Sequence, residues 1–125
     1  MKGLRAFELV VSILLLATAA PPASFAGQEG NPKAGKKTYD LMCARCHGSA
    51  GKGDGPVSRA LPTKPGSLAN GQHMKTLTDE YLFTVIKEGG ASVGKSPLMP
   101  AWGGLSDQDV WNVVAYIRSL AKSGE

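Results

Sequence analysis

The chain has 125 residues and carries 14 lysines and arginines against 10 aspartates and glutamates, a formal charge of +4. This length allows one domain. The charge balance is not that of a dedicated nucleic-acid binder, which would show clustered basic residues with interleaved aromatics, so we expect no nucleic-acid partner. A small domain commonly needs a disulfide, a metal or a cofactor to supplement its core. Two cysteines cannot form a disulfide framework, so the stabilising group must be sought elsewhere.

Residues 1–26 have the pattern of a secretory signal peptide. Lys2 and Arg5 give a positive start, a mostly apolar run extends from Leu9 to Ala20, and two prolines and a small-residue cleavage site follow. These twelve apolar-run residues would span about 18 Å as a helix, short of a hydrocarbon core of about 30 Å. An uncleaved anchor is the alternative. We therefore expect a periplasmic, exported protein of residues 27–125, without stable membrane insertion after cleavage.

The first predicted helix begins at Asn31, a good N-cap, with Pro32 in the first helical position. It should run to about Cys43. Gly35 and Tyr39 are four residues apart in it and therefore lie on one face.

The second predicted helix begins at Thr78. Acidic Asp79 and Glu80 then suit the positive end of the helix dipole in the first turn. The Gly89-Gly90 pair ends it. Its apolar face consists of Leu82, Val85 and Ile86.

The third predicted helix follows Ser106, which forms a variant capping box with Asp109. Apolar residues recur at helical spacing along it: Val110, Val113, Val114, Ile117 and Ala121.

No stretch of the sequence alternates apolar and polar residues with period two, so the predicted fold class is all-α. Residues 48–77 and 89–105 are predicted as long loops, which a compact domain tolerates only when they wrap around something. A large apolar cofactor would supply the missing core.

The segment from Cys43 to His47 is a C-x-x-C-H haem attachment pattern. Two thiols three residues apart at a helix end can reach the two vinyl groups on one haem edge and form thioethers. His47 would then serve as an axial ligand of the iron. The alternatives are a Cys43–Cys46 redox disulfide, which normally accompanies a βαβ unit, a zinc site that also uses His73, and an inert cysteine pair.

Four sequence blocks follow one another along the chain, at residues 34–39, 43–48, 53–56 and 98–102, and a further block ends it at 113–120. Together they resemble the class I monohaem c-type cytochromes of the exported bacterial type, over about residues 31–121. It implies a cytochrome c fold with three main helices and long loops around one covalently bound haem c and its iron. It also implies crossed terminal helices, with Gly35 and Tyr39 against Val113 and Tyr116.

The resemblance makes Met99 the sixth ligand of the iron. This methionine lies between Pro97 and Pro100, just before the last predicted helix. A methionine sulfur opposite a histidine raises the reduction potential. Met99 could instead fill a gap in the core, and His73 is the rival ligand.

Further site residues follow from the same resemblance. The Pro56 carbonyl is expected to accept a hydrogen bond from His47, or the proline only marks a turn. The Trp102 indole would donate to a haem propionate or cover the haem edge. Arg59 and Lys64 are candidate propionate partners, unless they are simply solvated charges.

These residues predict an electron carrier and not an enzyme, because an iron with both axial positions occupied has no open place for substrate. We expect a monomer that docks transiently with redox donor and acceptor proteins near the exposed haem edge. The alternatives are an electron-accepting subunit of a periplasmic oxidoreductase and a haem-based sensor with a labile sixth position. We also expect the haem-free chain to be largely unfolded.

Overall fold

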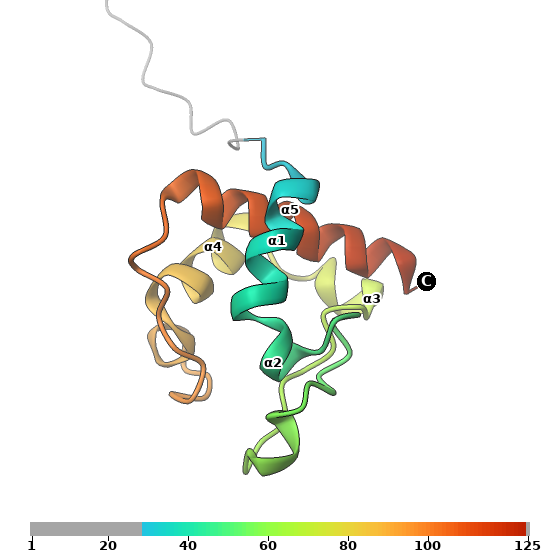
Figure 1. The fold of residues 1–125 in the computed structure, drawn as a ribbon, viewed down its shortest axis with the longest axis vertical. Coiled ribbons are helices and arrows are strands. Elements are labelled where there is room, and N and C mark those ends of the chain that lie inside the picture. Colours follow the sequence, from blue (N-terminus) through green and yellow to red (C-terminus); the bar gives the residue numbers. More distant parts are fainter. Residues whose placement is uncertain (1–28, 125) are drawn as a thin grey trace, which may run out of the picture.

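The structure, a computed structural model, describes residues 29–124, so the expected signal peptide lies outside the described residues. Within them every regular element is helical, which confirms the all-α fold class. The elements are α1 (Pro32–Met42), α2 (Ala44–His47), η1 (Ser58–Ala60), α3 (Gly71–Met74), α4 (Asp79–Glu88), η2 (Gly90–Val93) and α5 (Asp107–Ser123). Figure 1 shows α5 running across the molecule with α1 crossing it and α4 to one side. No helix in the described part has both the length and the apolar character to cross a membrane.

The three longer helices begin at the predicted caps. The side chains of Asn31, Thr78 and Ser106 each accept a backbone N–H from the first turn, at 2.9, 3.1 and 3.1 Å. Such bonds satisfy amide groups that have no partner within the helix. Gly89 follows α4 with φ of 86°, a conformation that favours glycine.

The prediction of two unstructured long loops is wrong in detail. Residues 48–77 contain the short helices η1 and α3, and residues 89–105 contain η2. At α3 the reason is local, because the Asn70 side chain accepts a hydrogen bond from the His73 backbone at 3.0 Å and so caps a helical turn. The first helix also ends at Met42, and a second short helix, α2, carries Cys46 and His47 with Cys43 as its N-cap.

The crossing of α1 and α5 depends on a very close backbone approach. A Cβ atom at Gly35 would lie 1.9 Å from the carbonyl oxygen of Asn112, so only glycine fits there. Beside this contact, the rings of Tyr39 and Tyr116 pack edge to face with centroids 5.0 Å apart. Val113 is fully buried in the same interface. The predicted pairing of the terminal helices is therefore confirmed.

The core continues from this crossing toward α4. Its buried residues are Tyr39, Met74, Leu82, Ile86, Val110, Val113, Val114, Tyr116, Ile117 and Ala121. Arg118 on α5 donates to the carbonyls of Met74 and Leu77 and pairs with Asp79. This one side chain thereby fixes the connection between α3 and α4 against α5.

Candidate functional site

A cavity of about 290 Å³ lies between the end of α1, α2, α4 and the two long connections. Its wall combines apolar residues of the core with most of the predicted site residues. These are Cys43, Cys46, His47, Lys64, Met99 and Trp102. The fold therefore brings the C-x-x-C-H segment and the region before the last helix to one place.

The two cysteines lie on a single helical turn at the cavity wall. The amides of Cys46 and His47 both donate to the Cys43 carbonyl, at 3.2 and 2.9 Å. Both cysteines are half-buried and their thiols are free, with no disulfide between them. Burial, and secondarily the neighbouring Cys46, raises the pKa of the Cys43 thiol to about 11. Two free sulfurs held on one turn at a cavity fit thioether attachment of a haem edge.

Burial also affects the protonation of the His47 imidazole. Burial lowers the pKa of its imidazole, because the charged form loses its hydration. The neutral ring is the form that ligates a metal. Its Nδ1 atom is buried and has no hydrogen-bond partner among the described residues. A buried polar atom without a partner is uncommon and calls for a functional explanation.

The hydrogen bond expected between His47 and the Pro56 carbonyl is not formed in this structure, since Nδ1 has no partner. Pro56 is exposed and does not line the cavity. Its neighbours nevertheless hold it beside the motif, because the amides of Gly55 and Val57 donate to carbonyls of Cys46 and Arg45. The structure thus places Pro56 next to α2 without the contact that the resemblance implies.

The competing ligand sets are not assembled. Within residues 29–124, no three His, Cys, Asp or Glu side chains gather closely enough to hold a metal ion, which leaves the zinc alternative without a site. His73 is exposed on α3 and does not line the cavity, whereas Met99 is half-buried and does. Arg59 is exposed on η1 outside the cavity, and Lys64 is exposed at its rim.

The segment that carries Met99 is fastened to the end of α4 by backbone contacts. The Gly90 amide donates to the Met99 carbonyl at 3.0 Å, and the Trp102 amide donates to the Ile86 carbonyl at 2.9 Å. Trp102 is half-buried against the core, and both interpretations of its indole group stay open. These contacts hold Met99 and Trp102 on the cavity wall.

Part of the cavity wall was not predicted. Tyr39 was expected only at the helix crossing, and Leu82, Val85 and Ile86 only on a core face, yet all four also line the cavity. The signal was present, since α4 has an apolar stripe at helical spacing. At the rim, Leu98 is 53% exposed, which no spacing pattern indicated.

The comparison with known proteins agrees with this geometry. Residues 30–117 match the protein family described as cytochrome c oxidase, cbb3-type, subunit III. Cytochrome c-554(547) of Halothiobacillus neapolitanus is 34% identical over 95 residues, which cover 73% of this chain and 98% of that protein. Cytochrome c6 of a Picosynechococcus strain is 32% identical over 130 aligned positions, which cover 100% of this chain and 99% of that protein. The two free cysteines and the apolar cavity fit the covalently bound haem c of the c-type cytochromes. The chain therefore belongs to this family.

Proposed function

We propose that this protein is an exported electron carrier whose haem c is attached through Cys43 and Cys46, with His47 and Met99 as axial ligands of the iron. The observation that carries the proposal is the shared cavity, whose lining residues include Cys43, Cys46, His47 and Met99. When bound, the haem supplies one-electron Fe(III)/Fe(II) chemistry. The two relatives, both named as cytochromes, support this role.

The residues of the chain would set the potential and keep water away. The buried side chains of Tyr39, Leu82 and Ile86 form part of an apolar wall, and such burial disfavours the more highly charged oxidised state. The neutral His47 ring provides a nitrogen lone pair, and the Met99 sulfur raises the reduction potential. With His47 and Met99 both holding the iron, the site would pass electrons and leave no open place for substrate.

Partner proteins would dock at the rim of this cavity. Leu98 is 53% exposed there, and the basic side chains of Lys64 and Lys95 line the same cavity without an acidic neighbour among the lining residues. An exposed apolar residue between charges suits a weak, transient contact between a monomeric carrier and its redox donor or acceptor.

A redox titration followed by absorption spectra tests the proposal on the matured protein. The wild type should show c-type haem bands, a single one-electron transition and a low-spin iron in both states. Met99→Ala should lower the potential or make the iron high-spin, whereas the control His73→Ala should change neither. Missing c-type bands in the wild type would refute the carrier, and an unchanged Met99→Ala protein would remove Met99 as ligand.

Carbon monoxide gives an independent check on the same preparations. We expect the reduced wild type to bind it slowly at neutral pH, because the methionine must first leave the iron. Rapid binding would indicate an open sixth position and so favour a sensor or ligand-binding role.

A further inference from the structure

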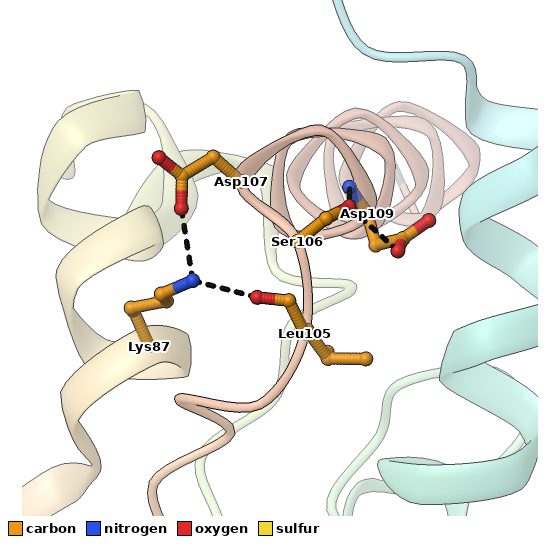
Figure 2. A network of polar contacts seen from close by, with 5 residues as sticks. All are labelled: Lys87, Leu105, Ser106, Asp107 and Asp109. Carbon is orange, nitrogen blue, oxygen red and sulfur yellow. Dashed lines mark hydrogen bonds and ion pairs between the residues drawn. The ribbon is translucent and has the colours of Figure 1, made fainter.

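The side chain of Lys87 joins the two ends of the loop that carries Met99. Lys87 lies in the last turn of α4, and its Nζ atom donates to the Leu105 carbonyl at 2.6 Å and to Asp107 Oδ1 at 2.8 Å. Figure 2 shows these two contacts on either side of Ser106, the residue that caps α5. The loop of residues 89–105 begins two positions after Lys87 and ends at its carbonyl partner. The lysine therefore closes the loop at its base.

Packing alone holds this loop weakly. Within residues 89–105 only Gly89 and Gly90 are buried, and Leu98 is 53% exposed. Three other side chains, those of Met99, Trp102 and Leu105, are only partly buried against the core. The segment therefore has the features of a region that opens at low free-energy cost. The backbone bonds from Gly90 to Met99 and from Trp102 to Ile86 hold its middle, and the Leu105 amide donates to the Trp102 carbonyl at 3.0 Å. None of these bonds joins Leu105 directly to α4, as the Lys87 side chain does.

We propose that Lys87 is a positioning residue for the sixth ligand, closing the Met99 loop so that the methionine sulfur stays at the cavity. The inference rests on the proposed function, in which Met99 binds the iron. The bond to the Leu105 carbonyl contributes most of the stabilisation of the closed loop, because its donor is the charged Lys87 side chain, which is only 25% exposed. Asp107 contributes less, since its side chain is 68% exposed.

The rate at which Met99 leaves the iron is the quantity to measure. In the ferric matured protein, imidazole at saturating concentration binds at a rate limited by loop opening. Lys87→Met removes both contacts and keeps the apolar stem of the side chain. It should raise this limiting rate on the order of tenfold, as expected for the loss of a hydrogen bond to a charged group. Lys87→Arg retains donors for both acceptors and should restore most of the wild-type rate.

Two further variants separate positioning from general stability. Lys36→Met breaks a comparable lysine–aspartate contact on α1, that with Asp40, and should leave the limiting rate unchanged. Asp107→Asn keeps the Leu105 bond and should raise the rate by less than Lys87→Met does. The near-infrared band of ferric methionine ligation should weaken in Lys87→Met only.

An unchanged limiting rate in Lys87→Met would overturn the proposal, as would an equal acceleration in Lys36→Met. Should Lys87→Met fail to mature, the Arg and Asp107→Asn proteins still decide the matter, because a wild-type rate in Asp107→Asn together with an accelerated rate in Lys87→Arg contradicts it. Failure of the ligand assignment is distinct: Met99→Ala would then have the wild-type spectrum. Failure of the Lys87 proposal alone leaves the spectrum of Met99→Ala altered.

Discussion

At the crossing of α1 and α5, the chain is packed so closely that Gly35 lies against the backbone of Asn112 and Tyr39 has no exposed surface. In the loop of residues 89–105, by contrast, only two glycines are buried. Met99, Trp102 and Leu105 are partly buried against the core, and the other contacts are backbone hydrogen bonds, two serine hydrogen bonds and one lysine side chain. The first region is held by burial of large side chains. The second is held by the partial burial of three side chains and by polar contacts.

This difference separates the two sides of the cavity. Cys46 and His47 lie on α2, and Cys43 is the single residue between α2 and α1, so the motif is continuous with the closely packed crossing. Met99 belongs to the lightly packed loop. We therefore expect the His47 side of the cavity to be rigid and the Met99 side to open first, because local opening follows the density of buried contacts.

Of all the changes considered, production of the chain without haem attachment should destabilise the two regions most. The cavity wall then loses its apolar contents, and both regions depend on the small core alone. We expect far-UV circular dichroism to show little helix and no cooperative thermal transition. A cooperative transition near that of the matured protein would mean that the crossing of α1 and α5 folds without the cofactor.

Gly35→Ala should disrupt the crossing of α1 and α5 directly. The new Cβ would lie 1.9 Å from the Asn112 carbonyl oxygen, so the two helices must separate. We expect the free energy of unfolding of the matured protein to fall by about 3 kcal/mol, measured by denaturant titration. Gly104→Ala is the matched control, because a Cβ there meets nothing within 4 Å, and it should change stability by less than about 0.5 kcal/mol. A loss equal to that of the control would contradict the close-approach argument.

Tyr39→Phe tests a smaller contribution of the same region. The Tyr39 hydroxyl donates to the Gly48 carbonyl at 2.7 Å, directly after the motif. That carbonyl also accepts from the Gly51 amide at 3.1 Å, so it keeps one partner when the hydroxyl is removed. We therefore expect a loss of about 1 kcal/mol in the free energy of unfolding.

The control for that substitution is Tyr81→Phe. Tyr81 is half-buried, and its hydroxyl makes no hydrogen bond with the described residues. Its removal should leave the free energy of unfolding within about 0.5 kcal/mol of the wild type. Equal losses in the two proteins would show that the bond from Tyr39 to Gly48 contributes nothing.

The parts of the fold that could be predicted from sequence depend on neighbours along the chain. Asn31, Thr78 and Ser106 cap their helices through amides two or three residues away, so the three longer helices were predictable. The C-x-x-C-H segment is equally local. The short helix α3 was missed because Asn70 followed by glycine is also a common turn sequence.

The parts that could not be predicted depend on contacts across the fold. Lys87 meets acceptors 18 and 20 residues away, and nothing in the spacing of these residues distinguishes it from a solvated lysine. The cavity-lining role of Tyr39 likewise depends on how α1 crosses α5. The hydrogen bond from His47 to the Pro56 carbonyl was expected from the resemblance alone. The His47 Nδ1 atom has no partner in the structure. The short distance along the chain between these two residues is therefore not enough to predict the bond.

The smallest effects should come from the two exposed lysine–aspartate pairs, one in each region. The carboxylates of Asp40 and Asp107 are 43% and 68% exposed, so water and salt screen both. Asp40→Asn and Asp107→Asn should therefore leave the unfolding midpoint of the matured protein unchanged within the error of a denaturant titration, at low and high salt alike. A clear loss in Asp107→Asn alone would mean that charge, as well as the bond from Lys87 to the Leu105 carbonyl, holds the Met99 loop. A clear loss in Asp40→Asn would mean that the crossing of α1 and α5 depends on more than the burial of its side chains.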